Sequence, residues 1–248
     1  MSIQPHHLIA PDDSPLRWRR EQLARSRGPG NDGTPRACCV HYGCGLSTAV
    51  GWHNYDASPT LYLQRLPLAG ALFRRAVRPR FPADARFGDV LRRLPHADNS
   101  VDFVYCSHVL EHLCLQDLRA ALRETDRILR PGGVFRGVLP DLDADARNYL
   151  DSASEDACSQ FMRTTALGQS DRNRGPLGFL KDLLGNSRHL WMWDFKGLRA
   201  ELTRAGFVEI RRAVHGDAAH SSYLTVEQRD RWEGCLGFEC RKATEVAC

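Results

Sequence analysis

The sequence predicts an α/β fold with a doubly wound, mostly parallel sheet and a helical cap insertion. Short apolar runs alternate with helical stretches from Ala37 onward. Two of these runs, at residues 101–107 and 133–140, flank a single amphipathic stretch, which is the pattern of a strand, a crossover helix and a parallel strand. The 248 residues are 42% hydrophobic and 26% charged, as in globular domains.

The first 36 residues are expected to form a helical or flexible arm. Ser14 is a candidate N-cap with Pro15 at the first helical position, and the glycines and proline at 28–30 would end a helix near Arg27. The sheet begins after this arm, so the main domain is expected to span residues 37–248.

The clearest elements lie between residues 101 and 140. The run VDFVYCS at 101–107 has the length and apolar character of a buried strand. A helix should follow and stop at Pro131 and the two glycines after it, before the strand GVFRGVLP at 133–140. Its buried face is expected to carry Leu115, Leu118, Leu122, Thr125 and Leu129.

The chain after residue 140 is expected to hold an insertion and then the end of the sheet. Helical fragments broken by glycine and proline occupy residues 141–193, including an amphipathic piece at 179–184. An insertion after a strand's carboxyl end sits over the crevice where open α/β sheets bind ligands, which predicts a substrate cap. A helix at 194–205 and strands at 207–214 and 235–242 follow.

Composition restricts the class of protein. No run approaches the roughly 18 apolar residues of a membrane span, and the first residues lack a signal peptide, so we expect a cytoplasmic protein that contacts no membrane. The nine cysteines are odd in number and form no CxxC pair, which predicts reduced thiols. The net charge of +4 is small for a nucleic-acid binder. Arginine-rich segments at 17–36 and 57–86 could meet phosphates, although a solvated face is the favoured interpretation.

The first strand is followed by a candidate ligand-binding turn. ACCVHYGCG at 37–45 ends on Gly43-Cys44-Gly45, where glycine lets backbone N–H groups approach a ligand. Asp56 comes eleven residues after Gly45, at the end of the next strand, where a carboxylate can accept hydrogen bonds from two ribose hydroxyls. Only residues 46–51 remain for a crossover helix, which favours an adenosine ligand without a pyrophosphate.

Five segments in this order resemble the class I S-adenosylmethionine-dependent methyltransferases, which have a Rossmann-like fold. They are HYGCG, GWHNYD, GDVLRRLPHADNSVDFVYCSHVLEHL, LRETDRILRPGGVFRGVLPDLD and RHLWMWDFKGLRAELTRAGFVEI, and they span about residues 37–215. The chain is similar in particular to a small bacterial subgroup with a shortened first crossover helix. The resemblance implies S-adenosylmethionine as the cofactor.

The resemblance also implies which residues hold this cofactor. The turn at 43–45 would face the methionine part, Asp56 the ribose, and Asp89 with the Val90 amide the adenine, while Ser107 would offer backbone to the methionyl end. The implied cofactor-binding residues are Gly43, Cys44, Gly45, Asp56, Asp89, Val90 and Ser107. Two positions depart from the family pattern: His41 stands where an acidic residue often begins the glycine motif, and the third glycine is missing.

Two histidines are candidates for a general base. A hydroxyl or ammonium acceptor must lose a proton, and a histidine with a pKa near 6.5 can take it. His108 follows the strand at 101–107, and His189 lies where the cap insertion returns. His112 is expected to pack or cap below the sheet edge. HVLEH at 108–112 also matches a zinc-binding pattern, which would need a third ligand and a helix that continues past it. The segment instead directly follows an apolar strand, where the methyltransferase resemblance already expects these residues, so we expect no metal.

The sequence therefore predicts a methyltransferase that acts on a small molecule, such as a natural-product intermediate, a sugar or another metabolite. A cap of about fifty residues favours a compact acceptor over a nucleic acid. Two alternatives stay open: a methyltransferase-fold protein that binds the cofactor without methylating, and an RNA methyltransferase guided by the arginine-rich segments. A homodimer is compatible with the sequence.

Overall fold

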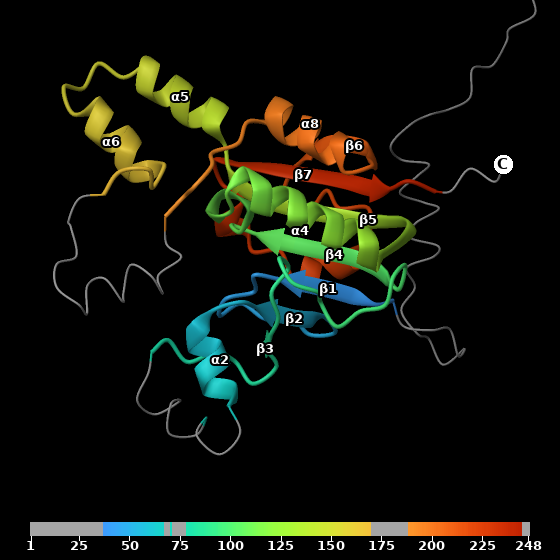
Figure 1. Cartoon of the computed structure of the whole chain (residues 1–248). Helices are drawn as coiled ribbons and strands as arrows, with labels where there is room; N and C mark the ends of the chain where they lie inside the picture. Colours follow the sequence, from blue (N-terminus) through green and yellow to red (C-terminus); the bar gives the residue numbers. More distant parts are fainter. Residues whose placement is uncertain (1–36, 67–69, 71–77, 170–187, 245–248) are drawn as a thin grey trace, which may run out of the picture.

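The computed structural model describes residues 37–66, 70, 78–169 and 188–244, and within them seven strands form one sheet. The strand order is β3-β2-β1-β4-β5-β7-β6, and β7 runs antiparallel to both of its neighbours while the other pairs are parallel (Figure 1). This confirms the predicted α/β fold; the N-terminal arm at 1–36 lies outside the described residues. The strands are β1 (Cys39–Tyr42), β2 (His53–Asp56), β3 (Arg86–Phe87), β4 (Val101–Ser107), β5 (Leu129–Pro140), β6 (Phe207–Ala213) and β7 (Cys235–Lys242).

One face of the sheet is covered by two helices that the sequence predicts. Figure 1 shows α4 and α8 side by side on this face. Their leucines Leu118, Leu122, Leu198 and Leu202 are fully buried in one core cluster. The helices of the described residues are α2 (Pro59–Arg65), α4 (Leu115–Ile128), α5 (Leu142–Leu150), α6 (Ala157–Thr164) and α8 (Phe195–Arg204). None of them combines the length and the apolar character that a membrane span requires.

The opposite face packs against the irregular segment 214–234, which contains the short 3-10 helices η2 (Ser221–Thr225) and η3 (Arg229–Arg231). Side chains of β4 alternate between the two faces, as in any strand buried on both sides. Val104 and Cys106 join the cluster with α4 and α8, whereas Phe103 and Tyr105 join the other cluster. The large aromatic members of that second cluster are Trp52, Phe103, Tyr105, Tyr223 and Trp232.

The predicted boundary between α4 and β5 is wrong by several residues. The helix ends at Ile128, and β5 begins at Leu129 instead of residue 133. Leu129 is extended, with a ψ of 137°, and pairs with Val101 of β4. Pro131 contributes to this early end, because helices usually end at or before the residue that precedes a proline, which here is Arg130. Leu129 is buried as predicted, but as a strand residue.

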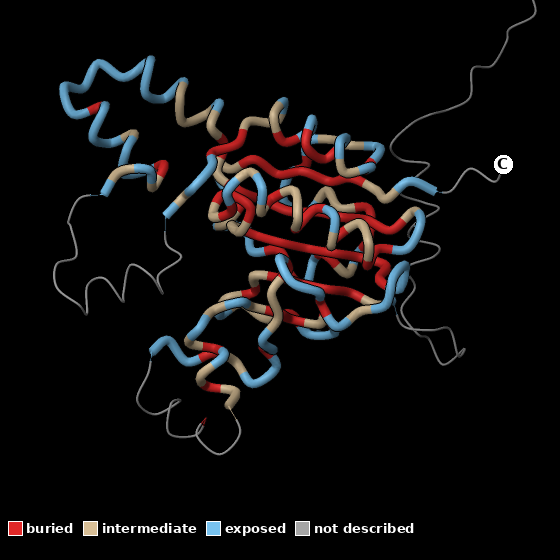
Figure 2. The backbone as a smooth tube through the Cα atoms, in the orientation of Figure 1, coloured by how far each residue is buried: buried red, intermediate tan, exposed pale blue. Residues whose placement is uncertain are grey.

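The insertion at 141–193 is described in part. Residues 141–169 form α5 and α6, which are mostly exposed and extend from the carboxyl end of β5 (Figure 2). Residues 188–193 return the chain to the sheet, where Asp141 bridges to Trp193. The amphipathic piece at 179–184 lies outside the described residues. A cap formed by the whole insertion therefore stays a prediction.

Stability should fall between pH 7 and pH 5 through His220, which caps η2. This buried histidine stacks on Phe103, and its Nδ1 accepts a hydrogen bond from Ser222 N at 3.2 Å, so the ring must be neutral. Burial lowers the pKa of His220 from 6.5 to about 4, although Asp102 opposes this shift. Because the folded pKa lies below the unfolded one, the unfolded chain binds more protons as the pH falls through 6.5.

We expect wild-type protein to lose about 1 kcal/mol more than His220→Asn over this interval, since asparagine keeps a cap acceptor but does not titrate. Urea unfolding at both pH values measures the difference. An identical pH response of the two proteins would contradict the prediction.

Candidate functional site

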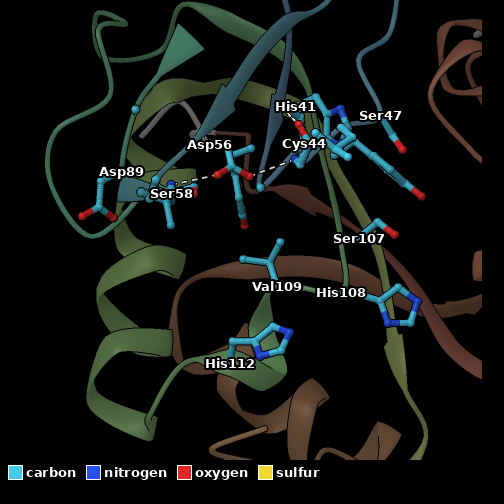
Figure 3. A pocket seen from close by; sticks show the side chains of 18 of the residues that line it. His41, Cys44, Ser47, Asp56, Ser58, Asp89, Ser107, His108, Val109 and His112 are labelled. Atoms are coloured by element: carbon cyan, nitrogen blue, oxygen red, sulfur yellow. Dashed lines mark hydrogen bonds between the residues drawn. The ribbon is translucent and has the colours of Figure 1, made fainter. Parts of the chain in front are cut away.

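A cavity of about 650 Å³ opens at the carboxyl ends of β1, β2 and β4. Parallel strands bring the loops that follow them to this edge, which is where α/β sheets bind ligands. Figure 3 shows side chains from these loops around the cavity, with Asp56 and Asp89 opposite Ser107 and His108. All seven residues that the sequence predicts for cofactor binding line it: Gly43, Cys44, Gly45, Asp56, Asp89, Val90 and Ser107.

The turn after β1 brings backbone to the edge of the cavity. Gly43 and Gly45 have φ values of +66° and +53°, a region that glycine adopts without a steric cost. A Cβ on Gly43 would overlap the Cγ2 methyl of Val109, whereas a Cβ on Gly45 would meet open space. Residues 43–52 contain turns and no helix, and the Cys44 N–H donates to Tyr55 O at 2.9 Å, which ties the turn to β2.

The carboxylate of Asp56 is held in place by backbone donors from both sides. Its Oδ2 accepts from Gly45 N at 2.9 Å, and its Oδ1 accepts from Ser58 N at 2.8 Å, as the dashed lines in Figure 3 show. Each carboxylate oxygen can accept more than one hydrogen bond. The two backbone bonds therefore orient Asp56 and leave acceptor capacity for a ligand in the cavity.

The remaining predicted cofactor-binding residues line the cavity from the ends of β3 and β4. Asp89 follows β3, and its Oδ1 accepts from Leu91 N at 2.9 Å. Val90 is buried next to it. Ser107 ends β4, and its Oγ accepts from Arg231 Nε at 2.9 Å.

Arg231 is a site residue that sequence reasoning missed. It lies at the end of η3 and is the one arginine or lysine among the described residues that line the cavity. Its guanidinium bonds Ser107, which is 124 positions away in the chain. No local pattern in the polar segment 214–234 announces this contact, because it arises when the segment folds over the sheet. Gln228, from the same segment, also lines the cavity.

His41, which replaces the expected acidic residue of the glycine motif, is buried at the end of β1. Its Nδ1 lies 3.3 Å from Asn54 Oδ1. Burial lowers the pKa of His41 to about 4, and the charge of Arg231 contributes in the same direction against the Asn54 hydrogen bond. The ring is therefore neutral near pH 7 and places no negative charge at this position.

His108 lines the cavity, but its geometry does not support the predicted role of general base. It has a φ of +52°, a strained turn that ends β4. Its Nδ1 is 3.3 Å from Glu111 Oε1, and its Nε2 is 3.0 Å from Arg231 O. Burial lowers the pKa of His108, but polar contacts with Cys235, Glu111 and Arg231 O outweigh it and raise the pKa to about 10. A protonated ring has no lone pair for another proton.

His189 does not belong to the described lining of the cavity, so the structure does not bring this second predicted base to it. Instead it lies beside His112, with ring centroids 5.0 Å apart. His112 does line the cavity, and its Nδ1 is 2.9 Å from Arg188 O. The expectation that His112 packs or caps below the sheet edge did not include this place at the cavity wall. Its place at the cavity follows from η1 (Leu110–His112), a single turn after β4.

Comparison with known proteins finds a matching family model and a curated relative of this chain. Residues 42–136 match the family model described as a methyltransferase domain. An uncharacterized 37.1 kDa protein in transposon TN4556 of Streptomyces fradiae is 31% identical over 123 residues, which are 48% of this chain and 35% of that protein. The chain thus matches about a third of the length of this curated relative.

Solved structures with a similar fold share little sequence with the chain. One belongs to a complex between the Haloferax volcanii Trm112 methyltransferase activator and a methyltransferase; it has 18% identity and a TM-score of 0.45, and the match covers 93% of this chain and 91% of that one. Another is a SAM-dependent methyltransferase from Thermotoga maritima, with 15% identity, a TM-score of 0.43 and 92% of each chain covered.

Proposed function

We propose, on the premise that residues 42–136 match the methyltransferase-domain model, that the chain is a class I S-adenosylmethionine-dependent methyltransferase and methylates a compact small molecule in the cavity described above. The observation that carries the proposal is the joint lining of one cavity by the glycine turn and by the fixed carboxylate of Asp56. Both face the same space at the carboxyl edge of the sheet.

The polar groups that line the cavity fit the three parts of S-adenosylmethionine. The turn at 43–45 would accommodate the methionine part, since a side chain at Gly43 would collide with Val109 while the face of Gly45 is open. Asp56 would accept hydrogen bonds from the ribose hydroxyls, and Asp89 from the adenine amino group. The guanidinium of Arg231 beside Ser107 would pair with the amino-acid carboxylate.

The bound cofactor supplies a methyl group that is already activated by a sulfonium. The protein's own contribution is then to align the acceptor with that group and to exclude water. Val109 and Leu113 provide apolar wall, and His108 and His112 provide polar wall on the side of β4. Neither predicted histidine base is required by this account, because alignment alone can supply a large part of the rate.

The size and charge of the cavity support a small acceptor. Its volume of about 650 Å³ lies within the range of roughly 300–1,000 Å³ that is typical of small-molecule sites. Nucleic-acid sites neutralise several phosphates with lysine and arginine. Here Arg231 is the single such residue among the described lining residues. Arg65, from one arginine-rich segment, instead bonds the carbonyls of Pro82, Ala83 and Ala85.

Replacing Arg231 by alanine should weaken binding of the amino-acid part of the cofactor. We expect roughly tenfold or greater loss of affinity for S-adenosylhomocysteine, because a charge-assisted hydrogen bond contributes about 1.5–3 kcal/mol. Methylthioadenosine lacks the amino-acid part, so its affinity should stay unchanged. Arg229→Ala is the matched control, since Arg229 belongs to the same 3-10 helix and is exposed. Calorimetry that shows equal losses for both ligands would refute the carboxylate contact.

The proposed function is tested by calorimetry with S-adenosylmethionine and S-adenosylhomocysteine, followed by a screen for methylated products. We expect binding of one cofactor per chain and transfer to at least one member of a panel of small hydroxyl, amine and carbon acceptors. Folded protein that binds neither compound would overturn the proposal. Binding without any methylated product would favour a non-methylating role, and RNA as the methylated species would exclude the small-molecule acceptor.

A further inference from the structure

A fully buried carboxylate lies directly behind the cavity. Glu111 is 0% exposed, and neither of its carboxylate oxygens accepts a hydrogen bond from any described residue. Its charged contact is His108, at 3.3 Å. A buried carboxylate normally has its acceptor sites filled, because an unfilled site loses hydration without compensation. Glu111 therefore has coordination capacity that the protein itself does not use.

Two imidazoles are directed to this carboxylate by backbone contacts. The Glu111 carbonyl accepts from Leu190 N at 2.7 Å and from Trp191 N at 3.1 Å, which fixes the returning insertion against η1 and places His189 there. His112 Nδ1 bonds the Arg188 carbonyl, so its Nε2 is free of a proton in the neutral ring.

His189 shows the complementary arrangement. Its Nδ1 is buried and has no hydrogen-bond partner among the described residues. This nitrogen therefore has a position that no described group fills. A ligating histidine characteristically has its other nitrogen held by a carbonyl or carboxylate, as His112 has through Arg188 O.

We propose that Glu111, His112 and His189 bind a divalent transition-metal ion at the wall of the methyltransferase cavity. One ligand atom from each residue lies within 4.8 Å of the others. Tetrahedral ligands of one such ion at about 2.0–2.2 Å are separated by roughly 3.3–3.6 Å, so side-chain rotations would have to draw the ligand atoms together by about an ångström to close the site. This ligand set departs from the expectation of no metal, because the third ligand comes from a segment 77 positions after His112 and not from the HxxEH pattern.

The ligand types select the class of ion. Two imidazoles with one carboxylate suit Zn²⁺, Mn²⁺, Fe²⁺ or Co²⁺, whereas Mg²⁺ and Ca²⁺ prefer oxygen ligands. Three protein ligands leave at least one coordination position open. His112 belongs to the cavity wall, so that position would face the acceptor space.

The site deepens the proposed function and rests on it in this respect: an ion held there would coordinate an acceptor that carries a hydroxyl or carbonyl oxygen. A metal-bound hydroxyl loses its proton to water more readily than a free one. This would achieve the deprotonation without His108, whose Nδ1 faces Glu111 and whose Nε2 lies 3.0 Å from Arg231 O.

The test is Zn²⁺ titration of the full chain without a histidine tag, after removal of metals with EDTA, with Mg²⁺ as the contrast ion. We expect one Zn²⁺ per chain, a rise in melting temperature on binding, and little response to Mg²⁺. His189→Ala and Glu111→Gln should each weaken Zn²⁺ binding by at least about tenfold and abolish the thermal shift. His215→Ala is the matched control, because His215 is exposed and outside the cluster.

Each outcome decides the proposal. If His189→Ala and His215→Ala bind Zn²⁺ with the wild-type stoichiometry and affinity, the ion lies elsewhere and the assignment is wrong. His189→Ala carries this comparison even if Glu111→Gln fails to fold. Calorimetry with S-adenosylhomocysteine on the metal-free protein separates the two proposals. Cofactor binding without a zinc site would overturn only the metal, and a zinc site without cofactor binding would overturn only the methyltransferase assignment.

Discussion

Asp56→Asn is expected to lower the affinity for S-adenosylhomocysteine by roughly 100-fold or more, since two charge-assisted hydrogen bonds to the ribose would be lost. The wild-type carboxylate uses one oxygen for Gly45 N and the other for Ser58 N. In asparagine the amide NH₂ must face one of these donors, so the turn after β1 loses an anchor in addition to a ligand contact. Isothermal titration calorimetry measures the effect.

Asp151→Asn provides the control for this substitution. Asp151 is exposed at the end of α5, outside the cavity lining. Asp151→Asn should leave the affinity for S-adenosylhomocysteine within about twofold of the wild-type value, because exposed polar groups distant from a site contribute little. Circular dichroism on both variants establishes that they are folded. Equal affinity of the two variants would mean that Asp56 does not hold the cofactor.

Arg136→Met should destabilise the protein by about 3–5 kcal/mol, the usual consequence of removing one partner from a buried ion pair. Arg136 is fully buried in β5 and pairs with Glu227, with Glu239 at 3.0 Å and with Asp217 at 2.9 Å. Its guanidinium also lies 4.6 Å from the ring centroid of Trp232. Methionine would fill the space but leave Glu227 buried without a counter-charge. Urea unfolding measures the change in free energy.

An exposed ion pair, formed by an arginine and an aspartate, provides the comparison for Arg136. Arg163 pairs with Asp156, and both side chains are more than half exposed, so Arg163→Met should cost about 0–1 kcal/mol. A loss below 1 kcal/mol for Arg136→Met would show that the cluster tolerates an uncompensated carboxylate. The cluster also has a functional consequence, because it anchors the segment 214–234, which carries Arg231 to the cavity.

Much of the cavity lining could be predicted because its residues lie at or directly after the ends of strands. Asp56 ends β2, Ser107 ends β4, and the turn at 43–45 follows β1. Parallel strands present their carboxyl ends at one edge, so recognising the strands is enough to bring these residues together. The helix end was harder to predict: α4 stops before the Arg130-Pro131 pair, and Leu129 is a strand residue.

The sequence by itself determined the local elements of this protein: the apolar run of β4, the buried faces of α4 and α8, and the polar residues at strand ends. Only the tertiary structure decided that β7 inserts antiparallel between β5 and β6, that Arg231 reaches Ser107, and that His189 lies beside Glu111 and His112. Periodicity reports which face of an element is buried. Which distant segment covers that face depends on hydrogen bonds and ion pairs between residues far apart in the chain, and no local pattern encodes those contacts.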